Sequence, residues 1–380
     1  MNSSFPDPLA MARALEIARK GLGMVAPNPP VGAVLVPKQG DQHWIEGWHQ
    51  KHGGPHAEVN CLAAAEEAGV ECKGADLYVT LEPCGHHGKT PPCADSIIEA
   101  EIARVIVSAD DPNPVTSGQG YQRLESAGIE VVRGVLAQQG KWLIAPYLCH
   151  LRHGRPLVTA KWAMTADGRI ACAGGDSKWI TSESTRVATR AARSEVDAIL
   201  VGIGTVLADD PRLTTGTEQE PEPVRVVIDP RCRTPVESRL FSEQGTVLIY
   251  CASESADTDP AQELRRCGAE VVSVAASEGV MWITEILQDL GRRGIQNLLV
   301  EGGSETHGRF LDAALVDRVQ ILIAPKLVGG RSAPGPVGGE GISRMELAQE
   351  IRCFHRREMG PDTVLEGAIS AAGVGDEAPA

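Results

Sequence analysis

The sequence Pro-Cys-Gly-His-His-Gly-Lys-Thr-Pro-Pro-Cys at residues 83–93, preceded by His-Ala-Glu at residues 56–58, decides how the first half of the chain is interpreted. The two segments supply one imidazole, two thiols and one carboxylate. His56, Cys84 and Cys93 are donors that Zn2+ prefers, and three protein ligands leave one coordination position open for water. Water on Zn2+ loses its proton near neutral pH. The pattern therefore predicts a catalytic zinc site.

Glu58 follows His56 by two residues and is expected to move protons beside the metal without binding it. An HxE segment followed by PCxxC is the signature of zinc-dependent nucleobase deaminases. Here eight residues separate the cysteines instead of two. Two alternatives stay open: Cys84 and Cys93 can be buried thiols that behave as small hydrophobes, and His86 or His87 can in principle bind the metal.

The composition limits the class of protein. A chain of 380 residues predicts two domains. Its net charge of −14 disfavours binding to a nucleic-acid backbone, so we expect a small substrate. No apolar run is long enough to cross a bilayer, and the N-terminus lacks a secretory signal, so we expect a cytoplasmic protein. In a reducing compartment, the ten cysteines favour metal ligands or core positions over disulfides.

Helices and strands alternate along the first half. Asp7 and Pro8 predict the start of a helix that runs to about Lys20. Strands are expected at residues 31–37, 75–81, 104–109 and 129–134, with helices from His56 to about Ala68 and from near Cys93. This order predicts an α/β domain, in which helix N-termini favour thiolate over thiol at the cysteines.

The basic segment His150–Pro156 contains turn-forming residues and predicts the domain boundary. We place the first domain at 1–149, a linker at 150–155, a second α/β domain at 156–370 and a disordered tail at 371–380. The Gly/Pro-rich stretch Gly329–Glu340 is also expected to be mobile. The remaining predicted elements are strands at 156–164, 197–202, 224–229, 246–250, 269–275, 297–303 and 318–325, and helices at 181–193, 260–267, 282–293 and 304–314.

Two of these strands end in glycine turns that lead into helices, at Val201–Thr205 and Val300–Ser304. Backbone N–H groups at such helix starts can bind phosphate, although plain tight turns explain the glycines equally well. Trp162 and Trp179 can stack on a planar ring, but single tryptophans are more often core residues. The full GxGxxG fingerprint of a Rossmann domain does not occur at either junction.

Motifs in both halves resemble a known family, the bifunctional deaminase–reductases of riboflavin biosynthesis. The resemblance covers nearly the whole chain in the expected order, and its most specific part is the long TPP-containing spacer between the cysteines. It implies a cytidine-deaminase-like αβα domain followed by a dihydrofolate-reductase-like α/β domain. The motifs are NPPVGAV, PHAE, TLEPCGHHGKTPPC and DPNP in the first half, and KWAMTADGRIA, SKWIT, VGIGTVLADDPRLT, VEGG and IAPKLVGG in the second.

For the first domain, the resemblance implies zinc-dependent replacement of the ring amine of 2,5-diamino-6-(ribosylamino)-4(3H)-pyrimidinone 5′-phosphate by oxygen. His56, Cys84 and Cys93 match the zinc ligands, and Glu58 matches the catalytic proton shuttle. The matching substrate-binding positions are Asn28, His49 and Lys89.

For the second domain, the resemblance implies NADPH-dependent reduction of the ribosyl side chain to a ribityl chain, with the cofactor supplying the hydride. Lys161 and Asp167 lie in the same region and are weaker candidates. The positions that match NADPH-binding residues are Ala163, Trp179, Thr205, Asp209, Gly303 and Ser304. The positions that match substrate-binding residues are Ser177, Arg193, Leu213 and Glu301.

The chain departs from the family pattern at a few positions. Where the family usually has an arginine shortly after Leu-Thr, this chain has Gly216, which removes a bidentate phosphate contact. Arg212 is a candidate replacement. In addition, Ala166 replaces the usual larger apolar residue before Asp167, and Gly85 replaces a common serine.

Three functional hypotheses follow from these residues. The first is an enzyme with both activities, acting on a small phosphorylated pyrimidine and forming a homo-oligomer. The second is a deaminase with a weak or inactive reductase domain, motivated by Gly216. The third is a nucleic-acid-editing protein, which the acidic charge and the lack of a basic, aromatic groove argue against.

Overall fold

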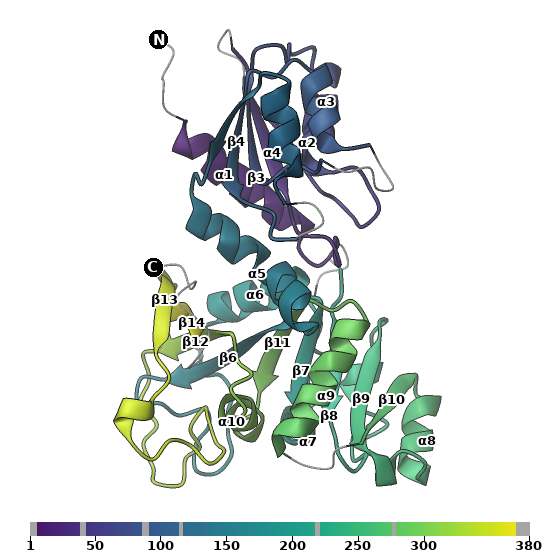
Figure 1. Ribbon diagram of the computed structural model, residues 1–380. Helices are drawn as coiled ribbons and strands as arrows, with labels where there is room; N and C mark the ends of the chain where they lie inside the picture. The colour runs from purple at the N-terminus through teal and green to yellow at the C-terminus, as the bar shows by residue number, and fades with distance from the viewer. Residues whose placement is uncertain are drawn as a thin grey trace. The chain divides into compact units, whose positions relative to one another are not determined.

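The computed structural model describes residues 6–38, 43–85, 91–113, 117–216, 221–275 and 279–369. The chain divides into two compact units between His153 and Gly154. Each unit is built around its own sheet (Figure 1).

The first unit contains a five-stranded sheet in the order β2-β1-β3-β4-β5. Strands β2, β1 and β3 pair antiparallel, whereas β3, β4 and β5 pair parallel. Its elements are α1 (Pro8–Ala18), η1 (Arg19–Gly21), β1 (Gly32–Val36), β2 (Ile45–Trp48), α2 (Ala57–Glu67), β3 (Asp76–Leu81), α3 (Cys93–Glu99), β4 (Arg104–Ala109), α4 (Gln119–Ser126), β5 (Glu130–Arg133) and α5 (Ala137–His153).

Alternating residues of the central strands send apolar side chains to both faces of this sheet. On one face, Leu35, Val79 and Val107 belong to a buried cluster that includes residues of α2, α3 and α4. On the other face, Val34 and Ile106 pack with buried residues of α1. Strands buried on both faces read as continuous apolar runs, which is why the sequence reveals them. The result is a three-layer αβα unit.

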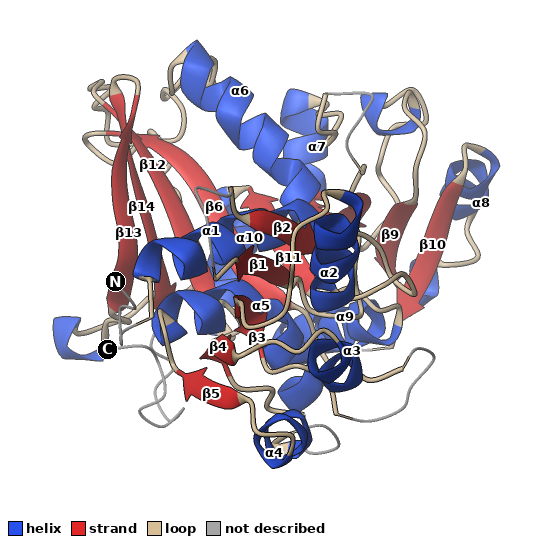
Figure 2. Ribbon diagram, turned by 90° about the horizontal axis from the view of Figure 1, so that it is seen from above, coloured by secondary structure: helices blue, strands red, loops and turns tan. Residues whose placement is uncertain are grey.

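The second unit contains a nine-stranded sheet in the order β10-β9-β8-β7-β11-β6-β12-β14-β13. The first seven strands in this order are parallel, and β14 and β13 are antiparallel at one end (Figure 2). Its strands are β6 (Leu157–Thr165), β7 (Ala198–Gly202), β8 (Val224–Ile228), β9 (Val247–Ala252), β10 (Ala269–Val274), β11 (Asn297–Gly302), β12 (Arg318–Ala324), β13 (Ile351–Met359) and β14 (Asp362–Ile369). Its helices are α6 (Glu183–Ala191), η2 (Ala192–Glu195), α7 (Ile203–Asp209), η3 (Arg239–Phe241), η4 (Ser253–Ser255), α8 (Asp259–Arg266), α9 (Gly279–Arg292), α10 (Ser304–Asp312) and η5 (Met345–Leu347).

Helices cover both faces of this second sheet as well. Trp282 and Ile286 of α9 and Phe310 of α10 pack in the largest core cluster against inward residues of the strands. On the opposite face, Val206 of α7 and Leu264 of α8 pack with Ile199 and other strand residues. Because β6, β7, β11 and β12 are parallel, their carboxyl ends meet at one edge, where ligands of α/β sheets usually bind.

The local signals in the sequence explain most element boundaries. Asp7 caps α1 as predicted, because its side chain accepts a hydrogen bond from the Leu9 N–H at 2.9 Å. The sequence did not predict β2, α4, α5, β13 or β14. The prediction that residues 150–153 belong to a linker is wrong, because α5 continues through His153, with its basic residues in the last turn, where they favour a helix C-terminus.

The segment Gly329–Glu340, which was expected to be mobile, makes hydrogen bonds to other parts of the second unit. The Gly338 N–H donates to the Ser304 carbonyl at 3.0 Å, and the Pro334 carbonyl accepts from the Ile170 N–H at 3.0 Å. The Glu340 N–H donates to the Asp312 carboxylate at 2.8 Å. Backbone hydrogen bonds therefore hold this Gly/Pro-rich segment against α10 and the loop after β6. The tail at 371–380 lies outside the described residues.

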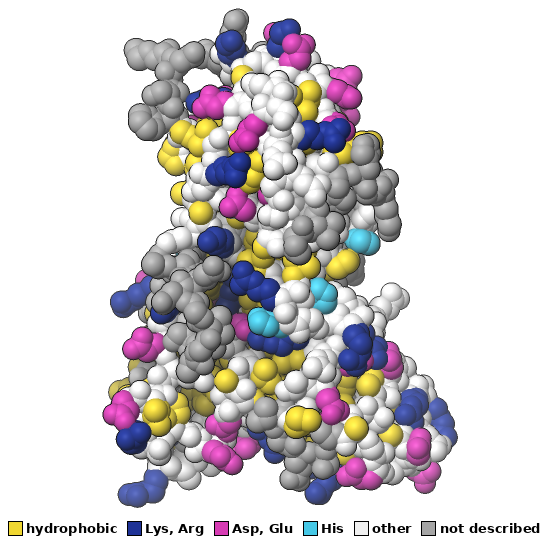
Figure 3. Space-filling view, in the orientation of Figure 1, with side chains coloured by type: hydrophobic (Ala, Val, Ile, Leu, Met, Phe, Trp, Pro, Cys, Tyr) yellow, Lys and Arg dark blue, Asp and Glu magenta, His cyan; other side chains and the backbone are white. Residues whose placement is uncertain are grey.

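Among the helices in the described part of the chain, none is both long and apolar enough to cross a membrane. On the face drawn in Figure 3, Lys and Arg side chains are interspersed with Asp and Glu side chains in each unit.

Candidate active sites

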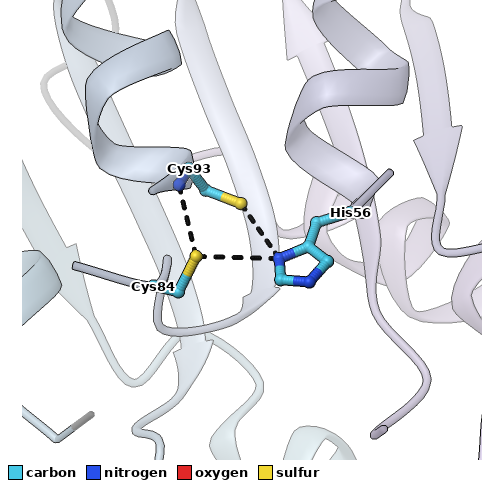
Figure 4. A group of neighbouring side chains, drawn as sticks. All are labelled: His56, Cys84 and Cys93. Atoms are coloured by element: carbon cyan, nitrogen blue, oxygen red, sulfur yellow. Dashed lines mark hydrogen bonds between the residues drawn. The ribbon is translucent and has the colours of Figure 1, made fainter. Parts of the chain in front are cut away.

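His56, Cys84 and Cys93 converge in the first unit, and their ligand atoms lie within 4.8 Å of one another. His56 is the N-cap residue of α2, and Cys93 is the first residue of α3. The His56 Nδ1 atom lies 3.2 Å from the Cys93 Sγ atom and 3.6 Å from the Cys84 Sγ atom (Figure 4). One imidazole and two thiols in this arrangement fit Zn2+, and among the described residues the group supplies three protein ligands.

Cys84 lies in the loop after β3, at the N-terminus of α3. Its Sγ atom accepts a hydrogen bond from the Cys93 N–H at 3.2 Å, and its carbonyl accepts from the Ala94 N–H at 3.2 Å. Hydrogen bonds from the Cys93 thiol and from His56 lower the pKa of Cys84, whereas the same interaction with Cys84 raises the pKa of Cys93. One thiolate is thus already favoured before a metal arrives.

Glu58 lies in the first turn of α2 and is only 3% exposed. It is not one of the three metal-ligating residues, and it lies beside Cys93. Burial raises the pKa of Glu58 to about 7, although the nearby His56 opposes the shift. A carboxyl group with such a pKa can both accept and donate a proton near neutral pH. Glu58, the residue predicted to move protons, is therefore buried beside the metal-ligating group and outside it.

Asn28 and His49, two of the predicted substrate-binding residues, lie next to the metal ligands. The His49 ring packs edge-to-face on the His56 ring, with 5.3 Å between centroids. The His49 Nδ1 atom lies 2.9 Å from the Pro55 carbonyl, which can only accept, so Nδ1 carries the proton. The Asn28 amide nitrogen then donates to Nε2 at 3.1 Å. Burial lowers the pKa of His49, which agrees with a neutral ring.

The third predicted substrate-binding residue, Lys89, lies outside the described residues, as do His86 and His87. Gly85, which replaces a common serine, is described. A Cβ atom added at Gly85 would lie 2.6 Å from the backbone carbon of Gln119. The close approach of the α4 N-terminus therefore requires glycine at this position in the present chain.

In the second unit, Arg193 and Glu301 form a buried ion pair. The Arg193 guanidinium donates to both Glu301 carboxylate oxygens, at 3.1 and 2.7 Å, and to the Thr214 carbonyl at 2.8 Å. The Lys161 ammonium lies 4.0 Å from the same carboxylate. Burial alone would raise the pKa of Glu301, but Arg193 and Lys161 outweigh it and hold the pKa at about 2. Glu301 is therefore a fixed anion at neutral pH.

The residues predicted to bind NADPH lie near the ends of parallel strands. Thr205 is in α7, after β7, and Ser304 begins α10, after β11. A Cβ atom added at Gly303 would lie 3.3 Å from the Thr205 Oγ1 atom, so these two helix starts are close together. Ser177 donates to the Asp209 carboxylate at 3.4 Å. Ala163 lies on β6, opposite Leu322 of β12.

The two tryptophans have different environments. Trp162 packs against the core cluster, and its ring centroid lies 5.5 Å from that of His307. Trp179 is 61% exposed, and the Arg186 guanidinium lies 4.3 Å from its ring centroid. Trp179 is thus more accessible to a ligand ring than Trp162, although Arg186 lies over its ring.

The Asp167 carboxylate already accepts hydrogen bonds from neighbouring groups of the protein. It accepts from the Thr165 hydroxyl at 2.6 Å and from the Gly329 N–H at 2.7 Å. These bonds lower its pKa to about 2, the Thr165 hydroxyl contributing most. Asp167 therefore stabilises the loop after β6.

The segment at 213–216 differs from the expectation for a phosphate site. Leu213 is buried, with φ of 56°, so only its backbone can face a ligand. Gly216 also has a positive φ, 78°. Arg212, the candidate replacement for the missing arginine, pairs with Glu243 at 3.4 Å on the surface.

Sequence reasoning missed three cations near the predicted residues of the second unit: Arg186, Arg190 and Lys326. The Lys326 ammonium donates to the Trp179 carbonyl at 2.6 Å. Arg186, Arg190 and Arg193 are spaced by four and three residues, which places them on one side of a helix. This spacing is the sequence signal that could have identified these arginines as a group.

Comparison with known families assigns a class to each half of the chain. Residues 6–109 match the model of the cytidine and deoxycytidylate deaminase zinc-binding region. Residues 156–365 match the model of the RibD C-terminal domain. The two domains together define a bifunctional enzyme that combines a zinc-dependent deaminase with a reductase.

Relatives that match along the whole chain identify the family. The riboflavin biosynthesis protein RibD of Actinobacillus pleuropneumoniae is 41% identical over 94% of each chain, and RibD of Escherichia coli is 37% identical over 94% of this chain and 98% of its own. The crystal structure of a diaminohydroxyphosphoribosylaminopyrimidine deaminase/5-amino-6-(5-phosphoribosylamino)uracil reductase from Thermotoga maritima is 38% identical, with a TM-score of 0.82 over 95% of this chain and 98% of its own. The structure of Acinetobacter baumannii RibD is 33% identical, with a TM-score of 0.80 over 96% and 99%. The chain belongs to the RibD family of riboflavin biosynthesis proteins.

Membership confirms several sequence predictions. The family, the cytidine-deaminase-like and dihydrofolate-reductase-like fold classes, and the pairing of a deaminase with a reductase are as expected. The cofactors of such an enzyme are zinc and NADPH, and the His56, Cys84 and Cys93 cluster fits the first of them.

Proposed function

We propose that this chain deaminates 2,5-diamino-6-(ribosylamino)-4(3H)-pyrimidinone 5′-phosphate and then reduces the ribosyl side chain of the product to a ribityl chain. Similarity to the Thermotoga maritima enzyme along both domains supports this assignment. The observation that carries it is the geometry of the first site. Three metal-ligating side chains lie within 4.8 Å, with the buried Glu58 beside them and outside the ligand set.

In the deamination, water replaces the ring amine, which leaves as ammonia. His56, Cys84 and Cys93 would hold the Zn2+ ion, which would lower the pKa of water at the site. Glu58 takes a proton from the attacking water and delivers it to the leaving amine, a transfer for which a pKa of about 7 suits it. Burial of Glu58 also excludes bulk water as a competing proton donor.

We assign recognition of the pyrimidine edge to Asn28 and an orienting role to His49. Both ring nitrogens of His49 are engaged, by Asn28 and by the Pro55 carbonyl. The amide oxygen of Asn28 can then accept from a ring N–H or amine. Lys89 is proposed to bind the substrate phosphate, as its position in the TPP-containing spacer implies.

In the reduction, NADPH would supply a hydride to the sugar carbon that bears the nitrogen. The carbon–nitrogen bond is kept, and a proton must reach the ring oxygen that leaves this carbon as the sugar ring opens. Glu301 cannot supply this proton, because it is held as an anion by Arg193 and Lys161. We propose that Glu301 instead accepts hydrogen bonds from sugar hydroxyls. Ser177, Arg193 and Leu213 complete the proposed substrate site, and the proposed NADPH site comprises Ala163, Trp179, Thr205, Asp209, Gly303 and Ser304.

A sequential assay tests both activities. Zinc-loaded protein is incubated with the diaminopyrimidine phosphate, ammonia is measured, and NADPH is then added while its absorbance is followed. We expect ammonia first and NADPH oxidation afterwards, with the ribityl product identified by mass spectrometry. Absence of ammonia would reject the deaminase assignment. Deamination without NADPH oxidation would support the second hypothesis, a weak or inactive reductase domain.

Three further predictions remain to be tested. We propose a homo-oligomer, a cytoplasmic location and no binding of nucleic acid, the last supported by the net charge of −14. Light scattering after gel filtration tests the oligomer. Retention of labelled RNA at low salt would contradict the last prediction.

A further inference from the structure

Arg190 has no hydrogen-bond or ion-pair partner among the residues that the structure describes, although it lies beside the proposed substrate site of the reductase. It is exposed on α6, one turn before Arg193. An arginine side chain loses conformational freedom when it is held in place, so a guanidinium with no protein partner is available to a ligand.

The other arginines near this site already interact with partners in the protein. The Arg193 guanidinium donates to both carboxylate oxygens of Glu301 and to the Thr214 carbonyl, so its donors are already engaged. Arg186 donates to the Thr181 carbonyl at 2.6 Å and covers the Trp179 ring. Arg212 pairs with Glu243. Of these four arginines, Arg190 is thus the one without a partner among the residues that the structure describes.

The backbone at Gly216 gives Arg190 its position. A Cβ atom added at Gly216 would lie 2.9 Å from the Arg190 Cδ atom and 3.7 Å from its Nη1 atom. Arg190 therefore occupies the space that a side chain at residue 216 would need. Arg193 reaches the same segment, because it donates to the Thr214 carbonyl. Two guanidinium groups therefore border residues 214–216, one paired with Glu301 and the other with no partner in the described part of the chain.

We propose that Arg190 binds the phosphate of the reductase substrate, in place of the arginine that resemblance to the family leads one to expect at residue 216. This inference rests on the proposed function. A phosphate monoester carries close to two negative charges and is bound best by the planar, bidentate fork of a guanidinium. Arg190 approaches segment 214–216 from the helix, whereas an arginine at residue 216 would approach from the segment itself. With glycine in place of arginine at residue 216, the phosphate contact is then kept and is made by Arg190.

Steady-state NADPH oxidation tests this assignment in the full-length, zinc-loaded enzyme. The substrates are 5-amino-6-(ribosylamino)uracil 5′-phosphate and its dephosphorylated form. Arg190→Ala should raise KM for the phosphorylated substrate about 10- to 100-fold with little change in kcat, because a charge-assisted bond is lost. KM for the dephosphorylated substrate should not change. Arg190→Lys keeps the charge but not the fork and should fall between the two.

Arg266→Ala is the matched control, because Arg266 is an exposed arginine on α8, at the other end of the same sheet. It should leave both KM values unchanged. An unchanged preference for the phosphorylated substrate in Arg190→Ala would overturn the proposal. A raised KM for NADPH with an unchanged substrate KM would overturn it as well, since Arg190 would then bind the cofactor.

Hydrogen exchange provides a readout that does not depend on turnover. The phosphorylated pyrimidine should protect backbone amides at 183–195 and 210–216 in the wild type and in Arg266→Ala, and much less in Arg190→Ala. Equal protection in all three proteins would contradict the role of Arg190 and leave the proposed reaction standing. Protection that depends on Arg190, in a protein that oxidises no NADPH, would reject the proposed reaction and leave the phosphate contact standing.

Discussion

Glu58 and Glu301 are two buried glutamates with opposite behaviour, one in each unit of the chain. Burial raises the pKa of Glu58 to about 7, because the opposing effects of His56 and of hydrogen bonds to the carboxyl group do not outweigh the penalty for a buried charge. Burial acts on Glu301 in the same direction, but Arg193 and Lys161 outweigh it, and the pKa is about 2.

The difference shows that the neighbours of a buried carboxylate decide its chemistry. Glu58 can exchange a proton at neutral pH, as hydrolytic deamination requires. Glu301 is a permanent anion that can orient cations and hydroxyl groups but cannot shuttle protons. Four predictions test this contrast.

Removal of the metal should have the largest effect, and it should abolish the activity of the first unit but not that of the second. Chelation of zinc, or Cys84→Ser, should reduce ammonia release to background, because the water loses its activating ion. NADPH oxidation with the deaminated substrate should persist, because its proposed residues lie in the other unit. The metal content of each sample is measured in parallel. Equal loss of both activities would contradict the assignment of zinc to the first unit alone.

Glu58→Gln should lower ammonia release roughly 100- to 10,000-fold, the usual contribution of general acid–base catalysis. The zinc content should stay at the wild-type level, because Glu58 is outside the ligand set. Glu66→Gln, an exposed substitution on the same helix, serves as the control. Full ammonia release by Glu58→Gln would show that another group moves the proton.

Glu301→Gln should destabilise the second unit without changing deamination. The substitution leaves Arg193, whose side chain is 17% exposed, without its carboxylate. Breaking a buried ion pair costs roughly 3–5 kcal/mol, and this partly exposed pair should lie near the lower limit. Calorimetric unfolding measures the effect, with the exposed Glu263→Gln of α8 as the control. A shift no larger than that of the control would mean that the pair contributes little.

The pH dependence of that destabilisation should be the smallest effect. The pKa of Glu301 falls from 4.5 to about 2 on folding, so its contribution is fully present above pH 4.5 and is lost as the pH falls towards 2. The difference in unfolding temperature between the wild type and Glu301→Gln should therefore shrink over this range. A difference that stays constant down to pH 2 would contradict a charged Glu301.

The sequence revealed most of the central strands because they are apolar and bounded by turn residues. It did not reveal β2, β13 or β14. Strand β2 has only four residues, with a glycine at its centre, and β13 is rich in charged residues, so neither carries an apolar run. The boundary at residues 150–153 failed for a related reason, since basic residues can mark either a linker or the last turn of a helix.

The metal site was predictable because its residues are close in sequence and of unusual type. The pairing of Arg193 with Glu301 was not, because it joins residues 108 positions apart through parallel strands. The neutral state of the His49 ring could not be predicted from the sequence either, because it depends on the Pro55 carbonyl and on burial. Motif spacing thus predicts which residues form a site, whereas the charge state of a residue depends on neighbours that the sequence does not reveal.

A crystal structure with anomalous diffraction recorded at the zinc absorption edge tests the central claim most directly. We predict one strong peak in the first unit, about 2.3 Å from the Cys84 and Cys93 sulfur atoms and about 2.0 Å from the His56 Nδ1 atom. Glu58 should approach the fourth position without binding the ion. A fourth protein ligand, or a fully active preparation with no metal at this cluster, would contradict the account.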